Sequence, residues 1–252
     1  EPIWLTKTET ASRVRSRIES VLDWAKGRGY RKGDNPAAWK GNLAAQLPRP
    51  AKVAKSAHHT TMPVDEIGAF MTRLRAAEGM GARALEFVIL TAARSGEVRG
   101  ATWAEIDLDA KVWTVPANRM KGNREHRVPL SPDAVALLKA LPRIKDNDLA
   151  FPAPRGGVLS DMTLTAVLRR MEIDAVPHGF RSTFRDWAAD RTNYPNHVCE
   201  MALAHAIGDK VEAAYRRGDL FDKRRRMMSD WAAFLRNVET AGAVIPMNRA
   251  QG

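Results

Sequence analysis

A histidine and an arginine three residues apart could together bind an anion. His178 and Arg181 follow Pro177, where we expect a helix to begin. Positions three apart on a helix lie on one face, so the imidazole and the guanidinium would point the same way. The amino end of a helix also attracts anions. These groups would make a phosphate site with a proton donor or acceptor, although most isolated His-x-x-Arg pairs are ordinary surface residues.

Arg94 is a second cation whose position requires a partner. It follows residues 82–92, an apolar segment that we expect to form a buried helix. Burying a lone guanidinium is costly, so Glu97 could neutralise it as a structural ion pair. The functional alternative is that Arg94 binds an anionic ligand.

Lys121 and Tyr215 are further candidates for chemistry. Lys121 lies near the turn of an expected hairpin, where its flexible side chain could protonate a leaving oxygen or could simply be solvated. Tyr215 is one of three tyrosines and precedes Arg216 and Arg217. Nearby cations favour the phenolate and so nucleophilic attack, whereas a packed tyrosine with a bonded hydroxyl is the commoner case.

The order of these residues resembles the catalytic signature of the tyrosine recombinase, or phage integrase, family. That signature is a first arginine, a hairpin lysine, a His-x-x-Arg pair, a histidine or tryptophan, and a late tyrosine. It is matched in order by Arg94, Lys121, His178, Arg181, His205 and Tyr215. The segments Leu90–Arg94 with Glu97, His178–Arg181 and Leu203–His205 look like the family's local motifs, and the segment His205–Leu220 is similar to integrases of prophages and genomic islands. The resemblance covers about residues 60–237.

The resemblance implies a site-specific DNA recombinase that integrates or excises a mobile element. Tyr215 would attack a DNA phosphodiester, giving a 3′-phosphotyrosyl link and a free 5′-hydroxyl, and the 5′-hydroxyl of a partner strand would reverse the step. Phosphoryl transfer depends mainly on positioning and charge stabilisation. The implied roles are phosphate binding for Arg94 and Arg181, proton transfer or phosphate orientation for His178, a hydrogen bond to the phosphate from His205, and protonation of the 5′-oxygen by Lys121.

No metal, ATP or other cofactor is implied, because the covalent link keeps the phosphoryl group activated. The implied partners are double-stranded DNA attachment sites, further protomers in a tetramer on DNA, and accessory DNA-bending or excision factors, with no membrane. Two other interpretations stay open. One is a type IB topoisomerase, which uses similar groups and relaxes supercoils as a monomer, and the other is a basic DNA-binding protein without catalysis.

The composition favours a polyanion as partner. The chain has 40 Lys and Arg against 29 Asp and Glu, a formal net charge of +11, and cations that neutralise phosphates release condensed counterions. The run Lys223-Arg224-Arg225-Arg226 could contact phosphates or a neighbouring protomer, or could be a solvated face. The single cysteine, Cys199, excludes an internal disulfide and fits a reducing cytoplasm. Together with this composition, the resemblance implies a bacterial or phage-encoded protein that acts on the chromosome in the cytoplasm.

Apolar spacing predicts the elements that must position these residues, in a mainly α protein with a small antiparallel sheet (the α+β class). The first expected helix, residues 8–26, carries an apolar stripe that includes Val14, Ile18 and Val21. Further helices are expected at residues 35–47, from Pro63, and at 82–92, 132–142, 160–171, 179–191, 195–204, 209–217 and 220–237. Strands are expected at residues 112–115, 119–121 and 127–130, with a turn at Gly122-Asn123.

Residues 48–61, with two prolines and several cations, are the expected linker. Residues 1–55 resemble the C-terminal part of the family's helical core-binding (DNA-binding) domain with its linker, and residues 56–252 form the expected catalytic recombinase domain. The first residue is glutamate rather than methionine, so we expect a fragment or a processed product. A full member of the family would carry more residues before it, including an arm-binding domain.

Overall fold

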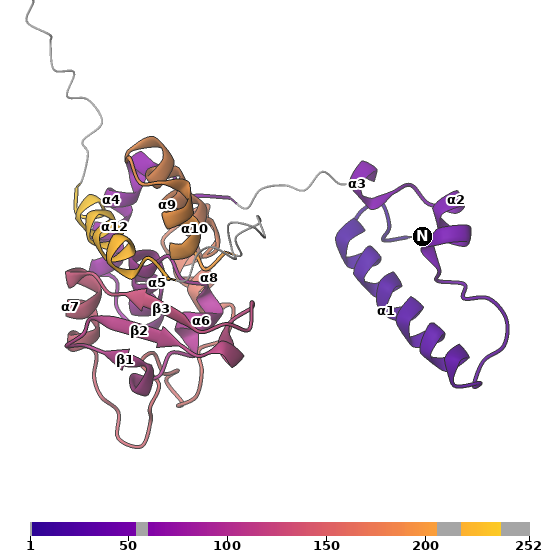
Figure 1. The fold of residues 1–252 in the computed structure, drawn as a ribbon, viewed down its shortest axis with the longest axis horizontal. Helices are drawn as coiled ribbons and strands as arrows, with labels where there is room; N and C mark the ends of the chain where they lie inside the picture. Colours follow the sequence, from indigo (N-terminus) through magenta and orange to yellow (C-terminus); the bar gives the residue numbers. More distant parts are fainter. Residues whose placement is uncertain (1, 54–59, 206–217, 238–252) are drawn as a thin grey trace, which may run out of the picture. The chain divides into compact units, whose positions relative to one another are not determined.

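The computed structural model of the chain describes residues 2–53, 60–205 and 218–237 (Figure 1). The chain divides into two compact units, Glu1–His58 and His59–Gly252. Helices dominate both units, and the second also contains a three-stranded antiparallel sheet. This confirms the predicted mainly α architecture with a small sheet. None of the helices within the described ranges is long and apolar enough to cross a membrane.

The first unit consists of one long helix followed by short helical turns. α1 (Thr8–Gly27) matches the predicted helix. The prediction of one continuous helix over residues 35–47 is wrong, because the chain forms a turn at Trp39–Leu43 (η1), then α2 (Ala44–Gln46), and later α3 (Pro50–Val53). Lys40 has extended backbone angles and Gly41 has a φ of +76°, so a helix cannot run through them.

The side chain of Asn35 explains why no helix begins there. Its oxygen accepts a hydrogen bond from the Ala37 N–H at 2.9 Å, while its amide donates to the Glu19 carbonyl at 2.9 Å and to the Asp23 carboxylate at 2.7 Å. Asn35 is therefore used to hold the loop against α1 rather than to cap a new helix.

The apolar stripe of α1 is only partly covered within the first unit. Val14, Ile18 and Val21 expose 43%, 48% and 63% of their surface. Ala11, nearer the start of the helix, is buried, and α1 packs against α3. The described part of the first unit thus leaves an apolar face of α1 open.

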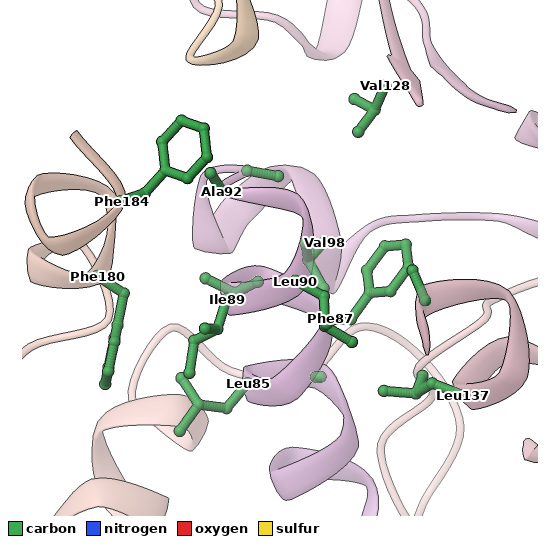
Figure 2. Packing of buried hydrophobic residues seen from close by; sticks show 14 of the residues in the cluster. Leu85, Phe87, Ile89, Leu90, Ala92, Val98, Val128, Leu137, Phe180 and Phe184 are labelled. Atoms are coloured by element: carbon green, nitrogen blue, oxygen red, sulfur yellow. The ribbon is translucent and has the colours of Figure 1, made fainter. Parts of the chain in front are cut away.

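The second unit is built around the buried helix α5 (Met80–Thr91), in which every residue from Ala84 to Thr91 is buried. It is contacted by α4 (Ile67–Ala76), which follows the turn η2 (Val64–Glu66), and by α6 (Ser95–Arg99), α7 (Pro132–Ala140), α8 (Thr163–Arg170) and α12 (Phe221–Phe234). Figure 2 shows Phe180 and Phe184 on one side of α5 and Leu137 on the other. A helix that is apolar nearly all round is covered nearly all round, as its sequence predicts.

The sheet contains β1 (Ile106–Asp107), β2 (Val112–Val115) and β3 (His126–Pro129), in that order and all antiparallel. The prediction of a strand at residues 119–121 is wrong, since Ala117–Arg119 forms a 3-10 turn (η4). The sheet instead contains β1, a strand that was not predicted. Arg119 pairs with the carboxylate of Glu105, the last residue of the turn η3 (Trp103–Glu105), and donates to the Glu97 carbonyl. These tertiary contacts hold its backbone away from the sheet.

The C-terminal helices α9 (Gly179–Asp190), α10 (Asn196–Ala202) and α12 pack on one another, and α12 contacts α5. Helices α9 and α10 agree with prediction, as does α12, whereas the helix predicted at residues 209–217 lies outside the described residues. On α12 the Trp231 indole N–H donates to the Ile89 carbonyl at 2.8 Å, and its ring lies 5.0 Å from that of Trp187 on α9. One tryptophan therefore ties α12 to both α5 and α9.

The first residue of α9 is a glycine because another segment of backbone crosses it. A Cβ on Gly179 would lie 2.2 Å from the Thr60 carbonyl oxygen and 3.2 Å from the Thr61 Cα. The same segment is fixed by a hydrogen bond from the Thr183 hydroxyl to the Met62 carbonyl at 2.7 Å. Residues 60–62 thus press directly on the start of the helix.

We expect Gly179→Ala to destabilise the second unit, because residues 60–62 and the start of α9 cannot move apart to make room for the Cβ without losing hydrogen bonds. Overpacking of this kind costs about 1–3 kcal/mol, so the melting temperature should fall by several degrees in a thermal denaturation experiment. Gly122→Ala is the matched control, since nothing lies within 4 Å of the added Cβ. Equal melting temperatures for the two variants would contradict the close approach.

His126 on β3 is a part-buried imidazole among cations. Burial and the charge of Arg224 lower its pKa to about 4, while Glu97 and a hydrogen bond with the Ala202 backbone oppose this shift and Arg94 adds to it. The imidazole is therefore neutral at neutral pH.

We expect His126 to make stability depend on pH below its ordinary pKa. Its folded pKa lies below the ordinary 6.5, so the unfolded state binds the proton more tightly. The free energy of unfolding is then unaffected above pH 6.5 and decreases as the pH falls towards 4. Urea denaturation at several pH values in this range should show that the free energy of unfolding depends less steeply on pH for His126→Gln than for the parent chain. An identical pH dependence in the two proteins would show that the pKa of His126 does not change on folding.

Candidate active site

The guanidinium of Arg181 on α9 is the centre of the candidate site. Only 5% of the residue is exposed. It donates to the Ala92 carbonyl, to the Leu203 carbonyl at 2.6 Å, and from Nη2 to Nε2 of His205 at 3.2 Å. These three partners come from the end of α5 and the segment that follows α10. Arg181 thus joins parts of the chain that lie far apart in sequence.

The local backbone explains how those carbonyls reach Arg181. Ala92 closes α5 in the left-handed conformation, with φ of +50°, and Ala204 turns the chain after α10 in the same way, with φ of +49°. Both turns end a helix and leave a carbonyl without a helical partner. The Arg181 guanidinium donates a hydrogen bond to one carbonyl at each of these helix ends.

Arg181 keeps its charge despite its burial. Burial is the main cause that lowers the pKa of Arg181 to about 10, and the neighbouring charge of Arg94 adds to it. Glu97 and Glu200 act in the opposite direction. The group is still protonated at neutral pH, and its interaction with Arg94 shows that the two predicted arginines lie near each other.

Arg94 stands at the start of α6 and is held there by Glu97. Its Nη1 donates to one Glu97 carboxylate oxygen at 2.8 Å, and its backbone N–H donates to the other at 2.9 Å. Its Nη2 reaches the Ala204 carbonyl at 3.4 Å. The predicted ion pair with Glu97 is confirmed. The Arg94 side chain remains 23% exposed.

His205 lies beside Arg181 and is 42% exposed at its side chain. Its Nε2 meets Arg181, and its Nδ1 lies 2.7 Å from a carboxylate oxygen of Glu200 on α10. Its backbone N–H donates to the Glu200 carbonyl at 2.9 Å. The imidazole therefore has a defined orientation while one edge stays open.

The other predicted residues are less fully placed. His178 is exposed at the N-cap of α9, one position before the predicted first turn, and its carbonyl accepts from the Arg181 N–H at 3.1 Å. Lys121 is exposed on the connection between β2 and β3. Tyr215 lies outside the described residues.

Sequence reasoning missed the carboxylate behind His205. Burial alone would raise the pKa of Glu200, but hydrogen bonds from His205 and Arg185 outweigh it and leave the pKa lowered. Glu200 is therefore an anion between two donors. It precedes His205 by five positions, which is not a spacing that places two residues on one helical face, so the sequence carries no signal for this contact.

Arg224 differs from the expectation for the basic run at residues 223–226. It is 1% exposed, donates to the Arg127 carbonyl at 2.6 Å, and pairs with the Asp219 carboxylate at 2.8 Å. This arginine therefore holds α12 to β3 and neither faces solvent nor offers a free donor set. The described residues contain no group of three or more His, Cys, Asp and Glu side chains that could hold a metal ion.

Sequence comparison matches both units of the chain to integrases. The model of the phage integrase family matches residues 60–219, and that of the phage integrase central domain matches residues 1–42. The integrase of Enterobacteria phage P4 is 32% identical over 251 residues, covering 91% of this chain and 55% of the relative. Prophage integrase IntA of Escherichia coli (strain K12) is 32% identical over 244 residues, covering 94% and 57%. The chain thus spans little more than half the length of these relatives.

Solved structures agree at the level of the fold. A lambda integrase tetramer bound to a Holliday junction superposes with a TM-score of 0.56 at 17% identity, covering 81% of this chain and 61% of that one. The integrase of the Tn1549 transposon, in complex with circular intermediate DNA, gives 0.54 at 15% identity, covering 87% and 78%. With the matches in sequence, this likeness leads to one conclusion: the chain belongs to the phage integrase family.

Proposed function

We propose that the chain is the part of a site-specific DNA recombinase that cuts and rejoins DNA strands through a tyrosine nucleophile, in order to integrate or excise a mobile element. The observation that carries the proposal is the meeting of Arg94, Arg181 and His205. These residues come from the start of α6, from α9 and from the segment after α10. Folding brings together two guanidinium groups and an imidazole, and a phosphodiester is the anion that such a group suits best.

The two arginines are preorganised for a phosphate. Arg181 is fixed by two backbone carbonyls and Arg94 by the Glu97 carboxylate. Their geometry therefore changes little when a ligand arrives, and donors held in place in advance stabilise developing charge most effectively. Outside the contacts described above, Arg181 retains its Nε–H and one Nη1–H, and Arg94 retains its Nε–H and one N–H on each terminal nitrogen, as donors for non-bridging oxygens.

In the proposed reaction the phenolic oxygen of Tyr215 forms a bond to phosphorus and the bond to the 5′-oxygen breaks. The phenolic proton passes to His178 or to solvent, and Lys121 protonates the departing 5′-oxygen. His205 contributes a further contact to the phosphate. The covalent link preserves the phosphoryl group for attack by a 5′-hydroxyl of another strand, which releases the tyrosine.

The partners follow from the same reaction. We propose that the chain binds double-stranded attachment sites and acts with other protomers, and the description of one structural neighbour as a tetramer on a Holliday junction supports this. Accessory DNA-bending or excision factors are a further proposed partner class. We also propose that residues 1–55 belong to a core-binding domain with its linker and residues 56–252 to the catalytic domain, which the two family matches support.

We expect Tyr215→Phe to bind DNA normally and to form no covalent adduct. The assay uses fluorescent duplexes with a nick and a randomised core sequence. After cleavage the short strand that ends at the nick diffuses away, so the covalent protein–DNA adduct accumulates. The adduct is then detected as a complex that resists detergent. Mass spectrometry of the adduct locates the modified residue. Tyr30→Phe is the matched control, because Tyr30 is 75% exposed in the first unit. An adduct with the Tyr215→Phe variant would place the nucleophile elsewhere.

The adduct assay and a plasmid-relaxation assay together separate the two alternatives. A binding protein without catalysis gives no detergent-resistant complex with any duplex. A topoisomerase-like enzyme relaxes a supercoiled plasmid that lacks recombination sites, and does so as a monomer.

We expect Arg181→Lys to slow adduct formation by roughly 10²–10³-fold, the usual effect of losing one charge-stabilising donor. Lysine keeps the positive charge but cannot present the planar fork. It also leaves a carbonyl unsatisfied, which costs about 1–3 kcal/mol of stability, so rates are compared well below the melting temperature. Arg169→Lys, on the exposed end of α8, is the control. An unchanged rate with the Arg181→Lys variant would remove Arg181 from the phosphate site.

A further inference from the structure

Glu200 connects the candidate site to a second arginine that no proposed step uses. One carboxylate oxygen lies 2.7 Å from Nδ1 of His205, and the other accepts from Nε of Arg185 at 2.9 Å. Arg185 is held in turn by the side-chain oxygen of Asn196. A continuous set of contacts therefore runs from α9 through α10 to the imidazole and ends at Arg181.

The partners on both sides decide which ring nitrogen of His205 carries the proton. A guanidinium can only donate hydrogen bonds. Nε2 of His205, which faces Nη2 of Arg181 at 3.2 Å, must therefore accept. The proton of the neutral ring is then on Nδ1, where it is donated to the Glu200 carboxylate. Both contacts are satisfied by one tautomer and by no other.

We propose that Glu200 is a positioning residue that holds His205 in the Nδ1–H tautomer, with the bare Nε2 turned towards Arg181. This inference rests on the proposed function and refines it: before a phosphate binds, Glu200 takes the Nδ1–H and Nε2 has no proton to donate, so His205 contributes by orienting Arg181. Carboxylates that orient a functional imidazole in this manner are common behind metal-bound and catalytic histidines. Without the carboxylate, the exposed ring would be free to rotate about its side-chain bonds.

Glu200→Gln is a sharp test because it preserves the size of the side chain and replaces one hydrogen-bond acceptor with a donor. Arg185 can only donate, so the amide oxygen of the new side chain must turn to Arg185. The amide NH₂ then faces Nδ1 of His205 and forces that nitrogen to accept. The ring proton moves to Nε2, where it confronts the N–H of Arg181. Two donors facing each other push the imidazole out of its place.

The experiment measures the tautomer and the cleavage rate on the same 252-residue chain. Two-bond ¹H–¹⁵N correlation spectra at neutral pH distinguish Nδ1–H from Nε2–H, and a His205→Asn sample identifies the His205 signals. We expect the Nδ1–H pattern in the parent chain and its loss in the Glu200→Gln variant. Adduct formation on the nicked duplexes should slow by on the order of 10–100-fold, with DNA affinity changed by less than about twofold, because the two arginines that bind the phosphate are retained.

A second substitution tests the logic of the donor arrangement. In the double variant Arg185→Met, Glu200→Gln, the amide is free to turn its oxygen to His205. The Nδ1–H pattern and most of the cleavage rate should return, which a general loss of packing would not allow. Glu172→Gln, an exposed residue after α8, controls for the loss of one negative charge.

The outcomes separate the inference from the proposed function. An unaltered tautomer or an unaltered rate with the Glu200→Gln variant, in a parent chain that forms adducts, would overturn the role of Glu200 and leave the recombinase proposal standing. Absence of adducts with the parent chain would overturn the recombinase proposal. In that case the nitrogen spectra would still decide whether Glu200 sets the orientation of His205.

Discussion

The burial of one guanidinium is the constraint on which the rest of the second unit depends. Arg181 is almost fully enclosed, and a buried cation is tolerated only when its donors are met. Its partners are carbonyls that two helices leave unpaired where they end. The ends of α5 and α10 are therefore fixed relative to α9 by the same group that would bind a phosphate. The hydrogen bonds that stabilise the fold around Arg181 therefore also set the geometry of the candidate site.

The sequence predicted the long elements because their apolar patterns are strong. α5 is apolar almost throughout, and α12 carries Met227 and Trp231 at helical spacing, so both were identified with nearly correct ends. β1 was missed because a two-residue strand has no period to detect. The false strand at residues 119–121 arose because Arg119 is committed to contacts with Glu105 and Glu97, which local sequence cannot reveal.

The sequence could point to residues of local motifs, whose catalytic roles stay predictions, but it could not point to a residue whose contacts are set by distant partners. Arg94, Arg181 and His205 were singled out in advance, and the fold brings them together. Glu200 could not have been chosen from sequence, since its partners Arg185 and His205 meet it only after α9 and α10 pack. Tyr215 is outside the described residues, so its role stays a proposal.

The glycine at the start of α9 has a mechanical consequence. The chain enters the second unit along residues 60–62, and these lie in contact with Gly179 and accept a hydrogen bond from Thr183. Thr183 is only two positions from Arg181. A force exerted on the chain at residue 60 would therefore be delivered first to the helix that carries Arg181, the arginine that we propose binds a phosphate. The first described residues of the second unit are thus mechanically coupled to the helix of the candidate active site.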